Sequence, residues 1–148
     1  MSERYLSRIG VDIFLERKNE ETGRKEILML LRDGTGYYDG YYDLPGGHLE
    51  AEEDIFDGMI REAKEEIGIR LNREDMEILQ IYHKWKRGML KFVFKTTKYE
   101  GEPINNEPEN CAKIEWIDFE NIPENTIPNI RKQLENIKTG VYYIKDEN

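Results

Sequence analysis

Three closely spaced glutamates, Glu62, Glu65 and Glu66, are the residues of this sequence whose spacing most directly allows chemistry. On a helix, offsets of three and four residues place Glu62 beside both of the others, so that three carboxylates crowd one face. Like charges at this spacing destabilise an isolated helix by roughly a few tenths of a kcal/mol per pair. The sequence therefore requires some compensating positive charge.

Two sources of compensation are available. Arg61 lies four residues before Glu65 and can pair with it, or with Glu53 from the preceding loop. A divalent cation is the stronger source, because Mg²⁺ prefers hard oxygen ligands, with water and phosphate oxygens completing its octahedron. The alternative is a solvated helix face without function, since glutamate-rich helices are common.

Glycines on both sides of the glutamates favour a site over a solvated face. Gly46 and Gly47 precede the helix, and without a Cβ they allow backbone carbonyls to approach a cation closely. Gly68 ends the helix directly after the three glutamates. The position of the carboxylates is therefore fixed at both ends.

The stretch from Gly47 to Ile69 resembles the Nudix box, Gly-x5-Glu-x7-Arg-Glu-apolar-x-Glu-Glu-x-Gly-apolar. Every fixed position is matched, by Gly47, Glu53, Arg61, Glu62, Ala63, Glu65, Glu66, Gly68 and Ile69. So many specified positions make the match specific. Residues 44–50, 107–111, Trp116 and 120–123 extend the likeness to MutT-like nucleotide hydrolases, over roughly residues 8–135.

The resemblance implies a magnesium site, with manganese as a substitute. The implied metal ligands are Glu62, Glu66, Glu65 and the carbonyl of Gly46. The residues implied in catalysis are Glu65 and Glu66, as candidates for the general base, and Arg61 and Glu53, which orient the glutamates.

Three further residues are expected to bind substrate: Arg32, Gly47 and Glu109. The Arg32 guanidinium can bind a phosphate bidentately, or it can pair with Asp33 or with a box glutamate. Glu109 is a third candidate for the base. Tyrosines precede the box and could stack on a nucleobase or simply pack; they are Tyr37, Tyr38, Tyr41 and Tyr42.

The favoured function is hydrolysis, with Mg²⁺, of the phosphoanhydride bond of a nucleoside diphosphate derivative. A (d)NTP or oxidised (d)NTP, converted to the monophosphate and pyrophosphate, is the first choice of substrate. An ADP-ribose or nucleotide-sugar pyrophosphatase uses the same box. A catalytically silent Nudix-fold nucleotide sensor is a third reading, although sensors usually lose box glutamates that this chain keeps.

The overall charge agrees with a small-molecule substrate. The 148 residues, the usual length of one domain, include 22 basic and 31 acidic residues, and the net charge is −9. An acidic surface repels nucleic-acid backbones and anionic lipids, so neither polymer nor membrane is an expected partner. Polyphosphate would also be repelled unless cations in the site reverse the local sign, which again favours a metal.

The expected compartment is the cytoplasm. The single cysteine, Cys111, excludes an internal disulfide, and residues 1–10 lack the apolar core of a signal peptide. No run reaches the roughly 18 apolar residues needed to span a membrane. A homodimer is common among similar proteins, and the sequence leaves the oligomeric state open.

The elements that position the box alternate between strand and helix patterns. Strands are expected over residues 9–15, 27–31, 77–85, 89–99 and 113–119. One helix should run from an N-cap at Asp54 to Gly68, and a last helix from an N-cap at Thr126, with Pro128 in its first turn. Together with the resemblance, this predicts a single α/β domain over residues 1–148, an α/β/α sandwich with a mixed sheet.

Two positions depart from common usage. Glu52 stands where many Nudix proteins have glycine, which makes the conformation of that loop uncertain from sequence. Gly58 lies inside the box helix, where glycine costs about 1 kcal/mol of helix propensity relative to alanine.

Overall fold

The computed structural model describes residues 2–148. It contains eight strands, two α-helices and two short 3₁₀ turns, η1 and η2. Their bounds, in chain order, are β1 Arg8–Lys18, β2 Lys25–Arg32, β3 Tyr42–Asp43, β4 Gly46–His48, α1 Ile55–Ile67, η1 Arg73–Asp75, β5 Glu77–Lys84, η2 Trp85–Arg87, β6 Met89–Thr96, β7 Cys111–Asp118, α2 Pro128–Lys138 and β8 Tyr143–Lys145.

The strands form one mixed sheet around β1, as predicted. Its main path runs β3-β2-β1-β6-β5-β8, while β4 pairs with β1 and β7 pairs with β2. The β1–β6 and β5–β8 pairs are parallel and the others are antiparallel. The register of the short strand β4 sets Gly46 opposite Asp12 of β1, which brings the start of the box against the centre of the sheet.

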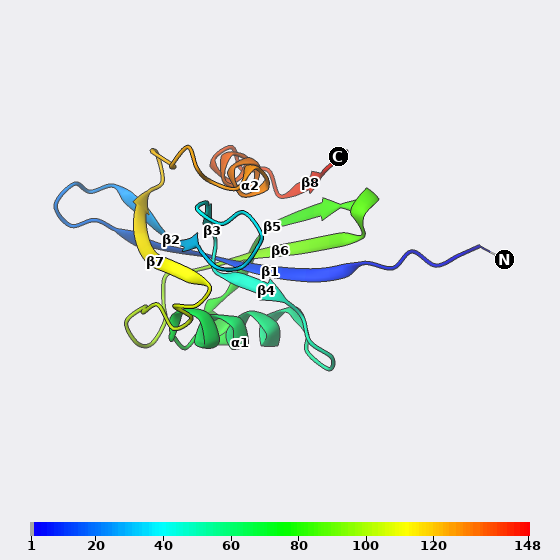
Figure 1. Ribbon diagram of the computed structural model, residues 1–148, viewed down its shortest axis with the longest axis horizontal. Helices are drawn as coiled ribbons and strands as arrows, with labels where there is room; N and C mark the ends of the chain where they lie inside the picture. Colours follow the sequence, from blue (N-terminus) through cyan, green and yellow to red (C-terminus); the bar gives the residue numbers. More distant parts are fainter. Residues whose placement is uncertain (1) are drawn as a thin grey trace.

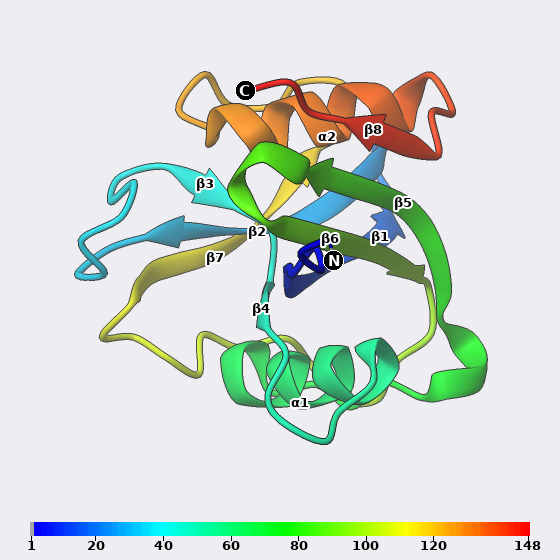
Figure 2. The same cartoon turned by 90° about the vertical axis from the view of Figure 1, so that its right-hand side faces the viewer.

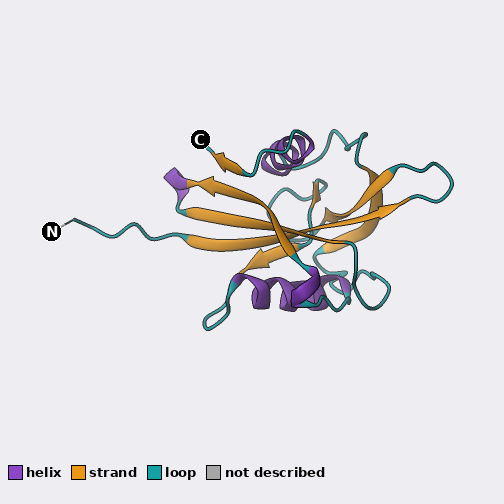
Figure 3. Cartoon of the chain, turned by 180° about the vertical axis from the view of Figure 1, so that it is seen from behind, coloured by secondary structure: helices purple, strands orange, loops and turns teal. Residues whose placement is uncertain are grey.

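Each face of the sheet is covered by one helix (Figures 1 and 2). Alternate residues of β1 serve the two faces: Val11 and Ile13 pack in the core beneath α1, and Phe14 packs in the core beneath α2. Figure 3 shows the two helices on opposite sides of the strands. The predicted α/β/α sandwich is therefore confirmed.

The box helix α1 begins and ends where the sequence indicates. The Asp54 carboxylate accepts a hydrogen bond from Asp57 N at 2.8 Å, and the Asp57 carboxylate accepts one from Asp54 N, which completes a capping box. Gly68 ends the helix with a left-handed φ of 68°. Met59 and Ala63 are fully buried against the sheet. Glu62 and Glu66 therefore lie half-buried, beside the face of α1 that packs on the sheet.

The prediction for the start of α2 was wrong in one detail. Pro128 is the first helical residue, as expected, but the N-cap is Ile127 and no side chain caps the helix. The Thr126 hydroxyl instead donates to the carbonyl of Pro123, at 2.7 Å. Strand β8 was not among the predicted strands; it has only three residues and is held by parallel pairing with β5. Neither helix has the length and apolar run needed to cross a membrane.

Both unusual positions near the box have a structural consequence. Glu52 adopts a φ of 68°, a conformation that glycine reaches without strain. At Gly58, a Cβ would overlap the terminal methyl of Leu49. The missing side chain at Gly58 therefore makes room for the loop that leads from β4 into α1.

Candidate functional site

The site begins at the two glycines of β4, which lie between β1 and α1. A Cβ on Gly46 would overlap the backbone of β1 at Val11, and a Cβ on Gly47 would lie 2.5 Å from the carboxyl carbon of Glu62. The Gly46 N–H donates to Glu66 Oε1 at 2.8 Å. Both glycines are needed because strand and carboxylates approach too closely for any side chain.

Arg61 connects most of the acidic groups of the box. Its Nε donates to Glu53 Oε2 at 2.6 Å, and one terminal nitrogen donates to Glu62 at 3.0 Å and to Glu65 at 3.1 Å. The other terminal nitrogen reaches the carbonyl of His48 at 3.0 Å. Both pairings that the spacing allowed, with Glu65 and with Glu53, are present together.

Glu66 lacks such a cation and lies in an acidic surrounding. Burial raises its pKa well above the usual value, and repulsion from Asp43, Glu62 and Glu107 acts in the same direction, against the Gly46 hydrogen bond. Burial also raises the pKa of Glu62, although Arg61 opposes the shift. The inner end of the carboxylate cluster is therefore short of positive charge.

Two cavities open onto Glu66. The smaller, of about 370 Å³, is here named the carboxylate pocket and is lined by Leu30, Arg32, Gly34, Thr35, Glu66, Glu107, Asn110 and Cys111. The larger, of about 520 Å³, is named the sheet cavity and extends along β1, β5 and β6 toward α2. Arg32 and Glu66 line both. The two residues therefore mark the place where the cavities meet.

Arg32 lies in the site but has neither of the partners foreseen for it. Its terminal nitrogen pairs with Asp43 at 3.0 Å, and its Nε donates to the carbonyl of Tyr37 at 2.6 Å. The alternative considered for Arg32, pairing with Asp33 or with a box glutamate, is not found within residues 2–148. The reason is that β3 pairs with β2, which sets Asp43 beside the end of the arginine strand.

The four tyrosines of the preceding loop divide into two groups. Tyr42 is buried and donates to Glu115 at 2.8 Å, so it packs inside the protein. Tyr37, Tyr38 and Tyr41 are exposed and contact one another edge to face. Tyr37 also lies under the Arg32 guanidinium, with 5.3 Å from the guanidinium carbon to the ring centroid.

Two acidic residues that line the cavities, Glu107 and Asp43, were not among the predicted site residues. Glu107 lines the carboxylate pocket, whereas Glu109 is exposed and lines neither cavity. Burial raises the pKa of Glu107, with repulsion from Glu109 and Glu65 in addition. Asp43 was also missed. The segment around Glu107 had been singled out as MutT-like, so a signal existed, but nothing in the spacing showed which carboxylate turns inward.

Family comparison agrees with this geometry. The model of the NUDIX domain family matches residues 6–137. These residues include the whole box and the strands β1, β2, β5 and β6, which contribute residues to the two cavities. The chain belongs to the Nudix family.

Two relatives carry the Nudix likeness at the sequence level. A MutT-like protein of Streptomyces ambofaciens is 29% identical over 85 residues, which are 57% of this chain and 53% of that protein. Nudix hydrolase 2 of Arabidopsis thaliana is 26% identical over 122 residues, 78% of this chain and 42% of that protein. The chain thus spans about half the length of these relatives.

Solved structures share the Nudix fold over nearly the whole chain. A MutT NUDIX hydrolase from Burkholderia pseudomallei has a TM-score of 0.73 at 25% identity, covering 87% of this chain and 96% of its own. The NUDIX domain of NrtR from Shewanella oneidensis, solved with ADP ribose, has a TM-score of 0.69 at 14% identity, covering 93% and 89%.

The Nudix glutamates of this chain suit a hard divalent cation. Their donor atoms are carboxylate oxygens, and their mutual repulsion is what a cation would relieve. Within residues 2–148, no three acidic, histidine or cysteine side chains already surround one point. Glu62 and Glu65 each contact Arg61 through one carboxylate oxygen, Glu62 Oε1 and Glu65 Oε2.

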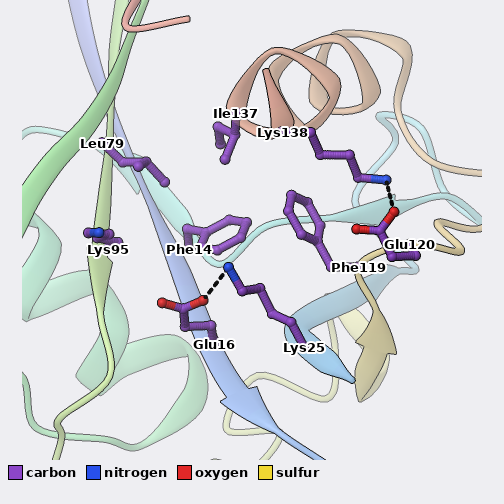
Figure 4. Close-up of a pocket in the computed structure, with 9 residues that line it drawn as sticks. All are labelled: Phe14, Glu16, Lys25, Leu79, Lys95, Phe119, Glu120, Ile137 and Lys138. Atoms are coloured by element: carbon purple, nitrogen blue, oxygen red, sulfur yellow. Dashed lines mark ion pairs between the residues drawn. The ribbon is translucent and has the colours of Figure 1, made fainter. Parts of the chain in front are cut away.

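A further cavity, of about 330 Å³, lies on the α2 side of the sheet, away from the Nudix box (Figure 4). Phe14 and Phe119 form its aromatic wall, with ring centroids 5.0 Å apart. Its lysines are already paired with glutamates: Lys25 with Glu16, Lys95 with Glu77 and Lys138 with Glu120. This cavity therefore presents no uncompensated charge to a ligand.

Proposed function

We propose that this Nudix protein is a Mg²⁺-dependent hydrolase of phosphoanhydride bonds, with a nucleoside triphosphate as the favoured substrate. The observation that carries the proposal is the complete box, folded so that Glu66 faces two cavities together with Arg32. At the inner end of the carboxylate cluster, Glu66 has no ion-pair partner within residues 2–148, and the guanidinium of Arg32 lines the same two cavities. That combination suits a cation and a phosphate chain bound together.

The metal-binding groups in this proposal are Glu62, Glu65 and Glu66 with the main chain of Gly46. When bound, Mg²⁺ or Mn²⁺ screens the anionic substrate, stabilises charge on non-bridging oxygens and lowers the pKa of water. Arg61 holds Glu62 and Glu65 in position and is itself held by Glu53 through two hydrogen bonds. Arg61 and Glu53 are therefore positioning residues.

The proposed substrate contacts come from Arg32, Gly47 and Glu109. Arg32 uses two of its nitrogens within residues 2–148, on Tyr37 and Asp43, and presents its planar fork at the junction of the cavities. A guanidinium in that place matches a phosphate bidentately. Gly47 offers main-chain atoms beside Glu62, and Glu109 lies in the loop before β7, with its carbonyl oxygen close to Gly34 of the carboxylate pocket.

Proton transfer is assigned to Glu65. Glu66 is enclosed by other carboxylates, which suits it to holding a cation. The side chain of Glu65 is 53% exposed and makes one hydrogen bond to Arg61, so a water molecule can reach its carboxylate. Glu66 is the other candidate, and the exposed Glu109 is a weaker third.

The choice of a triphosphate is supported by the MutT-like relatives. ADP-ribose is the second candidate, because a protein of the same fold was solved with ADP ribose bound. A nucleotide-binding sensor without activity is the third, and the intact box argues against it. A nucleotide sugar belongs with ADP-ribose, since both carry a substituted diphosphate.

The test is product release from a substrate panel in the presence of Mg²⁺. Purified protein is incubated with dGTP, 8-oxo-dGTP, ADP-ribose and a nucleotide sugar, and pyrophosphate and monophosphate products are quantified. The proposal expects pyrophosphate from the triphosphates and none without added metal. Turnover of ADP-ribose alone would select the second candidate. Thermal stabilisation by a nucleotide with no turnover of any substrate would select the sensor.

A further inference from the structure

The sheet cavity has a basic end that the reaction described above does not use. Arg8 at the start of β1, Lys84 at the end of β5 and Arg87 in η2 line it. The strand register brings the first two together, because Met89 of β6 is paired with Arg8 on one side and with Lys84 on the other. Residues more than 75 positions apart in sequence thus form one cluster, here named the basic end.

The cations of the basic end, Arg8, Lys84 and Arg87, have no aspartate or glutamate side chain paired with them within residues 2–148. Arg87 Nε donates to the carboxyl-terminal oxygen of Asn148, at 3.4 Å. Lys91, which lines the same cavity, is different, because it pairs with Asp12 at 3.0 Å and donates to Gln133 at 3.3 Å. Three cations without acidic side-chain partners stand out in a chain whose net charge is −9.

Lys84 shows the effect of this crowding most directly. Burial lowers its pKa, and repulsion from Arg87, Lys91 and Arg8 acts in the same direction, against attraction by Asp146. An anion placed among these side chains would relieve the repulsion. The geometry of the cavity, rather than this shift, decides what kind of anion fits.

The distance from the basic end to the box follows from the sheet. Arg8, Gly10 and Asp12 are alternate residues of β1 and point to the face that forms the cavity floor. Asp12 is paired with Gly46, whose N–H bonds to Glu66. Four residues of strand rise about 13 Å, so the basic end lies about that far from the carboxylates. A single pyrophosphate is too short to occupy both places.

We propose that the substrate carries a second phosphoryl group, bound by Arg8, Lys84 and Arg87, in addition to the pyrophosphate held at the box. This inference rests on the proposed function for the identity of the group at the box. Two chemical forms supply such a group: a phosphate ester on the nucleoside, or a longer polyphosphate chain. Simple ADP-ribose supplies neither.

Steady-state kinetics with paired substrates tests the proposal. The variants are Lys84→Gln, Arg87→Gln and the double variant. The control is Lys86→Gln, which removes a lysine from the same turn, where its ammonium lies over Trp85 and does not line the cavity. Substrates are a nucleoside 5′-triphosphate, its 3′-phosphorylated form and the 5′-tetraphosphate. The double variant should raise KM at least about tenfold for a substrate with the second phosphoryl, with kcat nearly unchanged.

The two substrates that carry a second phosphoryl group also show which chemical form the basic end binds. A KM effect confined to the 3′-phosphorylated substrate assigns the basic end to a phosphate ester. An effect confined to the tetraphosphate assigns it to the polyphosphate chain. Equal KM changes in the double variant and in Lys86→Gln, for every substrate, would overturn the proposal while leaving the hydrolase function intact.

A binding measurement without turnover separates this inference from the proposed function. Isothermal titration calorimetry in EDTA compares a nucleoside 3′,5′-bisphosphate with the 5′-monophosphate. The wild type and Lys86→Gln should bind the bisphosphate at least about tenfold more tightly, and the double variant should not. If that difference holds while no substrate is hydrolysed, the proposed function fails and the basic end stands. If wild type and double variant bind the bisphosphate equally, the basic end is not a phosphoryl site.

Discussion

At the scale of single residues, one guanidinium serves most of the acidic groups of the box. Arg61 contacts Glu53, Glu62 and Glu65, while Glu66 receives only the N–H of Gly46. Helical spacing predicted the contact of Arg61 with Glu65, because residues four apart on a helix are neighbours, whereas the contact with Glu62 was not predicted. Glu107 could not be chosen in the same way, since a loop has no fixed period that tells which carboxylate turns inward.

Replacing Glu66 by glutamine removes the negative charge of the side chain and keeps its size. Glu66→Gln should reduce the hydrolysis rate at least about 100-fold, because an amide is a weaker ligand for the cation. Its fold should be retained and its melting temperature should not fall, since the change removes a carboxylate whose pKa is raised by burial and repulsion. Hydrolysis rate and thermal unfolding are the measurements.

The control for this variant is Glu135→Gln, which changes an exposed glutamate on α2. It should leave both rate and melting temperature at the wild-type level. A wild-type rate for Glu66→Gln would remove Glu66 from the proposed metal-binding groups.

At the scale of elements, the box helix was the part most open to prediction. Its apolar period, its Asp54 cap and its terminal Gly68 are local signals, and all three are present. The cap of α2 was mispredicted because Thr126 has a nearer acceptor in the turn that starts at Pro123. β8 escaped notice because a three-residue strand has too few residues to show alternation.

The loop before α1 stores strain at Glu52. Glu52→Gly should raise the free energy of unfolding by about 0.5–1 kcal/mol, because glycine adopts the observed φ of 68° without steric cost. Chemical denaturation measures the change. Glu52→Ala is the matched control and should give no increase, since alanine keeps a Cβ. Equal stabilisation by both variants would show that the charge, not the backbone conformation, matters at this position.

The start of α1 should contribute a pH-dependent part of the stability. Hydrogen bonds from Arg73, with help from the N–H of Asp57, lower the pKa of Asp54 from 3.8 to about 2. Because the unfolded chain binds this proton first, the stabilisation is present above pH 4 and is lost as the pH falls toward 2. Asp54→Asn keeps a capping side chain but cannot form the ion pair.

Thermal unfolding of Asp54→Asn and wild type, measured between pH 4 and pH 2, tests this assignment. The difference in melting temperature between the two proteins should shrink as the pH falls. A difference that stays constant over the interval would show that the Asp54 carboxylate does not provide the pH dependence.

At the scale of the whole molecule, charge is separated along one sheet. Carboxylates gather where α1 meets β4, and the cations of the basic end gather at the start of β1 and the turn after β5. The net charge of −9 had indicated only that a polyphosphate would need local cations. The sequence could not place them, because the parallel pairing of β1 with β6 joins segments about half the chain apart.

The mixed sheet between two helices was predictable because the box resembles that of a known family, and the strands themselves have clear patterns. Pairing between the strands is a long-range property, which propensity does not determine. A single domain over residues 1–148, a cytoplasmic location and a homodimer stay predictions.

The account depends on the carboxylates of α1 taking up a divalent cation. Isothermal titration calorimetry with Mn²⁺ and with Mg²⁺, in the presence and absence of a nucleotide, measures this directly on the folded protein. We expect saturable binding by the wild type that is strengthened by nucleotide and greatly weakened in the Glu62→Gln, Glu66→Gln double variant. No uptake of either metal by the folded wild type, with or without nucleotide, would contradict the account.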